Sequence, residues 1–551
     1  MKIKKILITM LAIVATLCIT ACGNDDDDDL VDDSGKSVIR IFMNGGNEYD
    51  GRKKDSVWQK IEEEANVSLR IEGATHNSDY YQTLNPMINT GDIPDVIFTV
   101  PSSSGKAYSN WVEQDLLWNI DELIAEKPGE YPYIEALLNS EQYKNITYGD
   151  GAHTMIPYIT SNSGWGIYYR ADWLINVGYT EVNEKGETVA RTPKTIEEFQ
   201  EVLKLFTEND PDGNGKKDTY GLSPMGDTFY LNPLYHAFGV TPDYDLDAAG
   251  NPTYMYLQPE FKNFLGWFNQ MFSNGYIDPD FATNKNNMDR EKFFEEKVGI
   301  LITNAETHVT WIGNSADKAF GENKITFGDA PMGTKNLGKE GAQGFSDWGG
   351  WWGGYSISKD CHDPHAALRL FNYLYSPEGL MTRCYGIEGT HYIIYNGEVT
   401  PLVDGRNEEP EGSFVSCIQP DGTSLPTGYY KLGSAFSGNF AWNADYTKIT
   451  SKVEAKFIDL RYVDLIELGI QKNTLCSSKL TNVTGFYASY ATKMSKIEDE
   501  LNIYAMQVMM GQSNLTSDYA ALLEKLNGKN YDWSGVQRMI TEVARNAGVI
   551  A

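Results

Sequence analysis

The chain has 551 residues, of which 41% are hydrophobic, and a formal net charge of −30 at pH 7. This length exceeds one ordinary domain and predicts two large lobes, each with a core of its own. The charge argues against nucleic acid as a partner, because no cluster of Lys and Arg supplies the basic stripe that releases counterions. The cysteines past residue 22 lack zinc-site spacing and predict buried thiols, although a disulfide stays open in an exported protein: Cys361, Cys384, Cys417 and Cys476.

The first residues form an export signal. Lysines within positions 2–5 precede the apolar run 6–17, which is too short to span a bilayer. The tetrapeptide ITAC ends at Cys22 and resembles the lipobox of bacterial lipoproteins, which implies removal of residues 1–21 and lipid attachment to Cys22. The alternative is a soluble secreted protein cut near the same point. The acidic stretch 22–35 predicts a tether that holds the folded body away from an anionic membrane surface.

The folded body begins with alternating strand and helix patterns. Apolar alternation and helical spacing predict strand, helix, strand, helix and strand in turn over Val38–Phe42, Ser56–Ala65, Val67–Ile71, Asp79–Asn89 and Asp95–Thr99. This βαβαβ order predicts a mostly parallel sheet with helices on both faces. The ligand of such a sheet lies outside the carboxyl ends of its strands.

The run DPDGNGKKD at 210–218 is typical of a calcium loop and follows a capped helix predicted over 192–206. In an EF-hand register the central Gly215 provides the sharp turn. The expected Ca2+ ligands are oxygen donors, the fourth of the set through its backbone carbonyl: Asp210, Asp212, Asn214, Lys216 and Asp218. The twelfth position is Gly221 instead of Glu, so we expect a weaker or differently completed structural site and no calcium switch. The alternative is a solvated acidic turn.

No catalytic motif is complete in the sequence. The serine-hydrolase Gly-x-Ser-x-Gly, the phosphate-binding Gly-x-x-x-x-Gly-Lys-Ser/Thr and the zinc motif His-Glu-x-x-His do not occur. A glycosidase needs only two carboxylates across a cleft, which 76 acidic residues can supply, so sequence alone leaves that class open.

Several runs between about residues 36 and 395 share one pattern. They include GDIPDVIF at 91–98, GWGIYYRADWL at 164–174, TPKTIEEFQEVLKLF at 192–206 and WGGYSIS at 352–358. These runs resemble the extracellular solute-binding lipoproteins of ABC importers, in particular the oligosaccharide-binding branch that includes the maltose and alginate binders. The acidic loop also resembles the calcium site of the alginate binders, from which it departs at Thr219, where an acidic residue is expected.

The resemblance implies an α/β fold with two discontinuous lobes, mostly parallel sheets flanked by helices, and a ligand cleft between the lobes. The implied first lobe is 36–158 plus 355–396. The second is 159–354 plus 397–551, and it carries the calcium loop and C-terminal helices.

The function that the resemblance implies is a monomeric, non-enzymatic lipoprotein on the extracytoplasmic face of the cell membrane. It would bind an oligosaccharide and deliver it to the permease of an ABC transporter. The alternatives are a binding protein of the same fold for a peptide or other small solute, and a surface glycan-binding protein without a transport role.

Under this architecture three places face the cleft: the loop after the first strand, the end of the third strand, and the crossings between lobes. The candidate ligand contacts can hydrogen-bond to a sugar or stack on it: Asn44, Asn47, Glu48, Thr99, Ser102, Trp165, Trp348, Trp351, Trp352 and Trp442. The run DWGGWWGG at 347–354 is the strongest candidate, because three indoles among four glycines pack a core poorly but suit rings presented from a loop. The alternative for each ring is a place in the core between the lobes.

Overall fold

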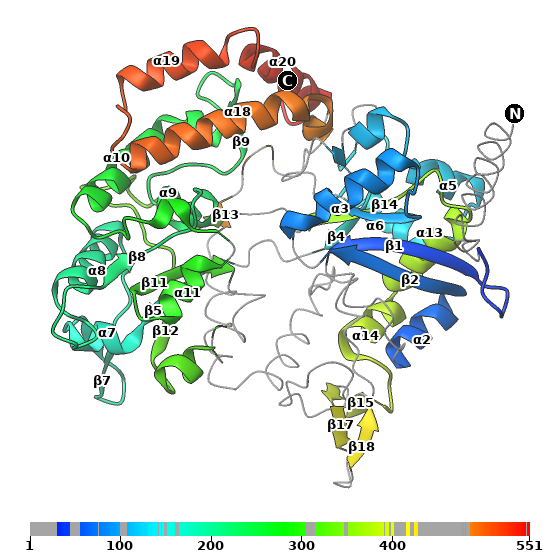
Figure 1. Cartoon of the computed structure of the whole chain (residues 1–551), viewed down its shortest axis with the longest axis horizontal. Coiled ribbons are helices and arrows are strands. Elements are labelled where there is room, and N and C mark those ends of the chain that lie inside the picture. The colour runs from blue at the N-terminus through cyan, green and yellow to red at the C-terminus, as the bar shows by residue number, and fades with distance from the viewer. Residues whose placement is uncertain are drawn as a thin grey trace, which may run out of the picture.

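A computed structural model gives the fold of most of the chain (Figure 1). The structure describes residues 30–44, 56–74, 77–99, 107–108, 110–140, 143–144, 146–147, 151–159, 165–285, 287–304, 312, 315–346, 351–390, 392–395, 398–401, 415–418, 424–427, 475–476, 478, 480, 485–546 and 548–550. None of the helices in these ranges combines the length and hydrophobicity needed to span a membrane.

A five-stranded sheet, in the order β2-β1-β3-β14-β4, forms the centre of the body termed here the first lobe. Its strands are β1 (Ser37–Asn44), β2 (Val67–Ala74), β3 (Val96–Thr99), β4 (Ile156–Ile159) and β14 (Trp351–Ile357). β1 runs parallel to β2 and β3, as the βαβαβ pattern predicts. β14, which comes from much later in the chain, lies antiparallel between β3 and β4.

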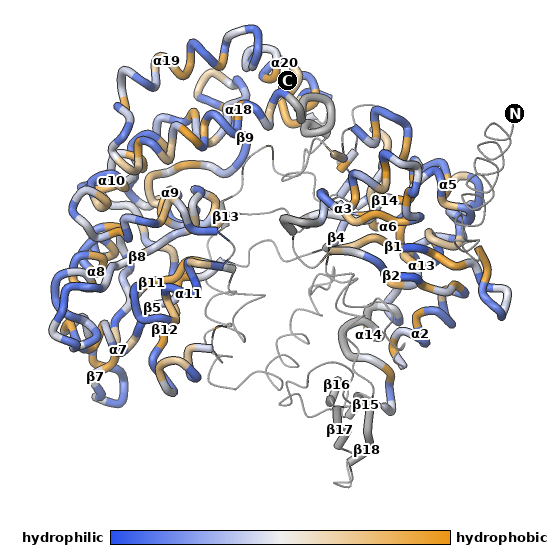
Figure 2. Tube along the Cα trace, viewed as in Figure 1, coloured by the Kyte–Doolittle hydropathy of each residue, from blue (hydrophilic) through white to orange (hydrophobic). Residues whose placement is uncertain are grey.

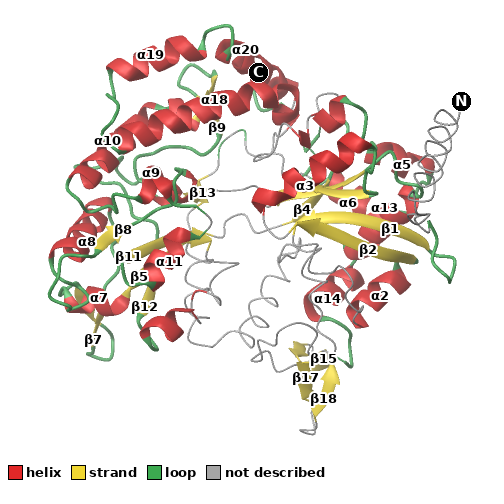
Figure 3. Cartoon of the chain, in the orientation of Figure 1, coloured by secondary structure: helices red, strands yellow, loops and turns green. Residues whose placement is uncertain are grey.

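Helices pack around this sheet (Figure 3): α2 (Ser56–Glu64), α3 (Asn77–Thr90), α5 (Ile120–Glu126), α6 (Pro132–Leu138), α13 (Pro364–Leu374) and α14 (Pro377–Tyr385). The central strands are apolar on both faces because helices cover both, and Ile39, Ile41 and Ile97 are almost fully buried. Asp363 caps α13, and its side chain accepts a hydrogen bond from the backbone N–H of Ala366 (2.9 Å).

A four-stranded sheet, in the order β12-β5-β11-β8, forms the centre of the second lobe. Its strands are β5 (Trp165–Arg170), β8 (Tyr220–Leu222), β11 (Val298–Asn304) and β12 (Ile325–Gly328). β5 is antiparallel to β11 and β12, and β11 is parallel to β8. The predicted helix after residue 192 is α8 (Ile196–Glu208), capped by Thr195, whose side chain accepts from the N–H of Glu198 (3.2 Å).

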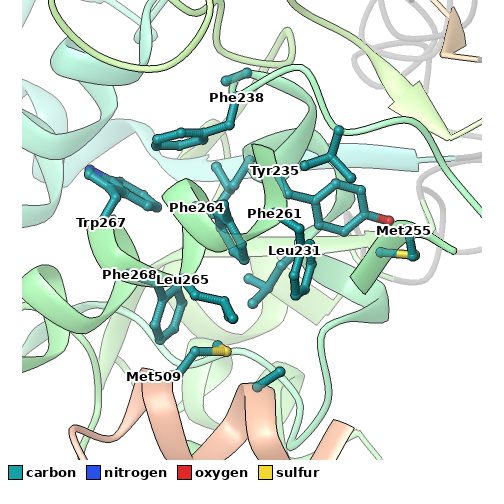
Figure 4. Close-up of a cluster of buried hydrophobic side chains, with 14 of the residues drawn as sticks. Leu231, Tyr235, Phe238, Met255, Phe261, Phe264, Leu265, Trp267, Phe268 and Met509 are labelled. Carbon is teal, nitrogen blue, oxygen red and sulfur yellow. The ribbon is translucent and has the colours of Figure 1, made fainter. Parts of the chain in front are cut away.

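The other helices of this lobe build a large aromatic core. They are α7 (Ala171–Asn176), η2 (Phe229–Leu231), α9 (Asn232–His236), η3 (Met255–Leu257), α10 (Pro259–Ser273), η4 (Phe281–Thr283), α11 (Met288–Phe294), α18 (Gly485–Met509), α19 (Ser517–Leu526) and α20 (Trp533–Asn546). Figure 4 shows Met509 of α18 close to Phe268 and Leu265 of α10. Along α10 and α18 orange and blue residues alternate in Figure 2, as expected of amphipathic helices that bury one face.

Short two-stranded sheets complete the described strands: β6 (Thr180–Val182) with β7 (Thr188–Ala190), β9 (Tyr244–Leu246) with β10 (Pro252–Tyr254), β13 (Phe345–Ser346) with β19 (Leu475–Cys476), β15 (Tyr392–Tyr395) with β16 (Glu398–Pro401), and β17 (Val415–Ile418) with β18 (Ser424–Thr427). The parallel pairing of β13 with β19 returns the chain to the second lobe near residue 475. Cys361 is a buried free thiol, and burial raises its pKa well above the ordinary value.

Two short connections join the lobes. Residues 160–164 lead from β4 of the first sheet to β5 of the second, and residues 347–350 lead from β13 back to β14. Both connections leave the same edge of the first sheet, because the register pairs Trp351 with Ile159.

Candidate ligand site and calcium loop

The edge of the first sheet at which the connections leave also holds the carboxyl ends of its parallel strands. β1 ends there at Asn44 and β3 ends there at Thr99, which pairs with Gly354 of β14. Ligands of open α/β sheets bind outside these carboxyl ends. The backbone positions of three predicted ligand residues, Asn44, Thr99 and Trp351, therefore lie along one edge, and Trp352 follows in the same strand.

The side chains described at this edge are mostly packed. Thr99 is fully buried, and its Oγ1 lies 3.5 Å from the hydroxyl of Tyr81. Tyr81 is only half-buried and lies beside Trp111, with ring centroids 6.3 Å apart. Tyr81 thus brings a half-buried phenol to this edge, as does Tyr158 of β4, and neither was among the residues predicted from the sequence.

The facing edge of the second sheet carries an aromatic cluster. Trp165, the first residue of β5, pairs with Asn304 at the end of β11. Its indole is 1% exposed and packs edge-on against Phe229 and Tyr230, with both centroid distances 5.2 Å. Phe229 is 53% exposed. Trp165 thus supports the cluster from beneath, and Phe229 presents the open ring.

A group of charged side chains lies beside these rings. Arg290 of α11 donates to Thr303 Oγ1 of β11 (2.9 Å) and to Asn287 Oδ1 (2.7 Å). Asp289 is 3% exposed, and burial raises its pKa to about 6, with a smaller contribution from the carboxyl of Asp227. Asp227 accepts from the N–H of Phe229 (2.9 Å), and burial raises its pKa as well. Three separate segments of the chain supply this group, so no local sequence motif predicts it.

The start of the second connection is anchored by a buried histidine. His236 of α9 donates from Nδ1 to the carbonyl of Val240 (2.7 Å), since that carbonyl can only accept. The Ser346 hydroxyl then donates to Nε2 (3.0 Å), and the Ser346 N–H donates to Asn232 Oδ1 (3.0 Å). Burial lowers the pKa of His236 to about 4, so the ring is neutral at pH 7.

The predicted calcium loop is a tight turn between α8 and β8. Gly215 has φ +79°, a conformation that favours glycine, and its N–H donates to Asp210 Oδ2 (3.0 Å). The Asn214 side-chain N–H groups donate to Asp212 Oδ2 (2.6 Å) and Asp218 Oδ1 (3.1 Å). The four predicted side-chain ligands, Asp210, Asp212, Asn214 and Asp218, thus converge. Lys216 donates its N–H to Asn214 Oδ1 (2.8 Å).

The loop has some of the features of a cation site and lacks others. Asp210 Oδ1 is buried without a hydrogen-bond partner among the described residues, and burial and nearby carboxyl groups raise the pKa of Asp212. Both features are typical of carboxylates that a cation would balance. Over the described ranges, however, no group of three His, Cys, Asp or Glu side chains has the geometry of a metal site. Thr219 donates to the carbonyl of Phe206 (2.8 Å) and faces α8, so its hydroxyl does not complete the shell.

A pocket of about 650 Å³ adjoins this loop. Its lining residues are mostly charged: Asp212, Asn214, Asp218, Tyr220, Asp278, Pro279, Asp280, Lys292, Glu295, Glu296 and Lys297. Lys292 already donates to Asp278 (2.6 Å) and to Asn284 (2.7 Å). The pocket lies where β8 and β11 begin, at the edge of the sheet opposite Trp165. Ligands of such sheets bind at the carboxyl ends of the strands, so this pocket is not the expected ligand site.

Several predicted site residues lie outside the described part of the chain: Cys22, Asn47, Glu48, Ser102, Trp348 and Trp442. For Asn44, Trp351 and Trp352 the structure gives the backbone position.

Comparison with known proteins settles the family. The family described as bacterial extracellular solute-binding protein matches residues 45–381, which is more than half of the chain. The chain belongs to this family. YtcQ of Bacillus subtilis, a polygalacturonan/rhamnogalacturonan-binding protein, is 26% identical over 373 residues, 67% of this chain and 68% of YtcQ. FusA of Streptococcus pneumoniae, a fructooligosaccharide ABC transporter substrate-binding protein, is 24% identical over 311 residues, about half of each chain.

Solved structures of solute-binding proteins have the same fold. FusA in complex with kestose superposes with a TM-score of 0.63 at 16% identity, covering 93% of this chain and all of FusA. The alginate-binding protein AlgQ2 without calcium ion gives a TM-score of 0.59 at 17% identity, covering 92% of this chain and 97% of AlgQ2. The predicted α/β solute-binding fold and the predicted family are therefore confirmed. The family and these relatives are binding proteins, which agrees with the incomplete catalytic motifs.

Proposed function

We propose that this solute-binding protein binds an oligosaccharide between the facing edges of its two sheets and delivers it to an ABC transporter permease. The observation that carries the proposal is the arrangement of these edges. Both short connections, 160–164 and 347–350, join the first sheet at the edge with Thr99 and Tyr81, and the edge at Trp165 presents the half-exposed ring of Phe229. Apolar rings stack on the C–H faces of sugars, while hydroxyl and amide groups bind their hydroxyls.

The names of the relatives support a sugar ligand. YtcQ is named for polygalacturonan and rhamnogalacturonan, FusA for fructooligosaccharides and AlgQ2 for alginate. We therefore assign an oligosaccharide to this chain, with Asn44, Asn47, Glu48, Ser102 and the indoles of residues 348–352 and 442 as further candidate contacts. The Gly-rich composition of 347–354 supports indoles presented at the second connection.

We also propose that the loop 210–218 binds Ca2+ for stability. The residues that would hold it are Asp210, Asp212, Asn214, Asp218 and the carbonyl of Lys216. Bound Ca2+ would neutralise the carboxylates of Asp210, Asp212 and Asp218 and fasten the end of α8 to β8. Binding requires Asn214 to offer its side-chain oxygen to the cation, which a rotation of the amide achieves.

Lipid attachment at Cys22 completes the proposal. The positive start, the apolar run and the ITAC sequence support export and anchoring, and a lipoprotein, LipO of Bacillus subtilis, is 24% identical over 310 residues. An anchored body on an acidic tether would stay near a permease in the same membrane.

A thermal-shift screen of the body without its signal sequence, with neutral and acidic oligosaccharides and with short peptides, tests the function. Ligands that bind the folded state raise the melting temperature by mass action. We expect stabilisation by at least one oligosaccharide class and by no peptide. Stabilisation by peptides alone would assign the protein to another ligand class.

A further inference from the structure

The charged group on the second lobe bears on which sugars the site accepts, an inference that rests on the proposed oligosaccharide function. Asp289 lies in the first turn of α11, and its Oδ1 has no hydrogen-bond partner among the described residues. A buried carboxylate without full hydrogen bonding is costly and is usually kept for a purpose. The segment that carries Asp289 lies next to the aromatic cluster of Phe229, because the neighbouring Arg290 donates to Thr303, and Thr303 pairs with Gly166, the residue after Trp165.

The charged group beside Phe229 contains two acidic side chains, Asp227 and Asp289, and one basic side chain, Arg290. Burial raises the pKa of Tyr230, and the carboxyl groups of Asp289 and Asp227 are near enough to raise it further. Asp227 likewise adds to the effect of burial on the pKa of Asp289. Arg290 is the described cation in their midst, and its guanidinium already donates to Asn287 and Thr303. The group therefore carries a net negative charge whenever both carboxyl groups are ionised.

A ligand in contact with the Phe229 ring is close to this negative charge, and the mostly buried protein around the charge screens it poorly. Like charges in such surroundings repel more strongly than they do in water. The carboxylate of a uronate unit would lose its hydration there, and the single positive charge of Arg290 is already outweighed by the two ionised carboxylates of Asp227 and Asp289. A neutral sugar avoids the repulsion, stacks on the ring and uses its hydroxyls as hydrogen-bond donors.

We propose that the wall formed by Asp227, Phe229, Asp289 and Arg290 makes this a binding protein for neutral oligosaccharides, with Asp289 as a specificity-determining residue that disfavours uronates. Asp289 acts through its charge, because it is almost completely buried and does not itself need to contact the sugar. A neutral preference is a property that the names of the relatives leave open, since YtcQ and AlgQ2 are named for acidic polymers and FusA for neutral sugars.

Calorimetric titration with charge-matched sugar pairs tests this proposal. The probes are oligogalacturonides and their neutral methyl esters, xylo-oligosaccharides with and without a glucuronate branch, and fructo-oligosaccharides. At pH 7.5 we expect the neutral ligand that binds most tightly to exceed every uronate at least tenfold in affinity. In Asp289→Asn the ratio of neutral-sugar affinity to uronate affinity should fall at least threefold, because asparagine keeps the shape of the side chain and removes its charge. Glu524→Gln on the exposed face of α19 removes one charge far from the site and should leave the ratio unchanged.

The wild-type protein alone provides a second readout, which keeps the proposal testable should the Asp289 variant not fold. Protonation of Asp289 below pH 6 should narrow the ratio of neutral to uronate affinity between pH 7.5 and pH 5.5, since uronates remain charged over that range. Uronates binding as tightly as neutral sugars, or a ratio that neither the variant nor the lower pH changes, would overturn the proposal and leave the oligosaccharide function standing. Binding of no sugar of either kind would instead overturn the proposed function.

Discussion

The buried His236 makes the stability of the second lobe depend on pH in a defined direction. Its folded-state pKa is about 4, against 6.5 for an unperturbed histidine, because burial disfavours the charged ring. Between these values the unfolded chain binds a proton that the folded chain does not, so stability is fully present above pH 6.5 and falls as the pH drops toward 4. The side chain is 1% exposed, and the shift corresponds to a loss of about 2 kcal/mol between pH 7 and pH 5.

Urea unfolding of the wild type and of His236→Gln at both pH values isolates this contribution, because the other titrating groups are common to the two proteins. Gln can accept the hydrogen bond from Ser346 but does not titrate. The stability lost between pH 7 and pH 5 should be smaller in the variant by about 2 kcal/mol. Equal losses in the two proteins would mean that His236 is protonated in the folded state and that the hydrogen-bond assignment to Ser346 is wrong.

Calcium removal, core packing, the exposed Phe229 ring and the lipid anchor each give a measurable outcome. EGTA should lower the melting temperature, by the equivalent of about 2.7 kcal/mol if Ca2+ was at a hundredfold excess over its Kd; no shift, with no calcium in elemental analysis, rules out the site. Gly299→Ala should destabilise by about 1–3 kcal/mol in urea, because its Cβ would lie 2.2 Å from the Phe206 ring, and an unchanged midpoint refutes this packing. Phe229→Ala should cost about 1–3 kcal/mol of sugar affinity in calorimetry with little change in melting temperature, since the ring is 53% exposed; unaltered affinity removes it from the site. Cys22→Ala should release the protein from membranes on fractionation, and full retention contradicts lipid anchoring.

Local features of the fold are predictable because they depend on neighbouring residues. The helix expected after residue 192 begins at Ile196 and is capped by Thr195. The spacing of Thr195 and Glu198 predicts a capping box, in which the Glu198 carboxylate accepts from the N–H of the cap residue Thr195. In the structure this carboxylate accepts instead from the N–H of Lys194 (2.8 Å), and Arg191 also donates to it (2.6 Å). When several donors can reach one carboxylate, all of them determine its position. The sequence spacing of Thr195 and Glu198 alone does not predict which donors it binds.

Features assembled from distant segments are not predictable in this way. β14 lies between β3 and β4, although most of the second lobe separates it from them in sequence. The charged group joins residues of three segments. Asp227 precedes a short helix and Asp289 lies in the first turn of α11, which explains each position locally but not why the segments meet. The sequence predicts the Trp165 ring as a ligand contact, but the fold buries this ring and exposes that of Phe229, because packing partners decide which ring reaches solvent.

The proposed function places the ligand between the facing sheet edges. A crystal structure of the body with the oligosaccharide that binds most tightly would locate this ligand. We expect sugar in contact with Phe229 on the second lobe and with Tyr81 on the first. Sugar bound instead in the acidic pocket beside Asp278 and Lys292, at the opposite edge of the second sheet, would contradict it.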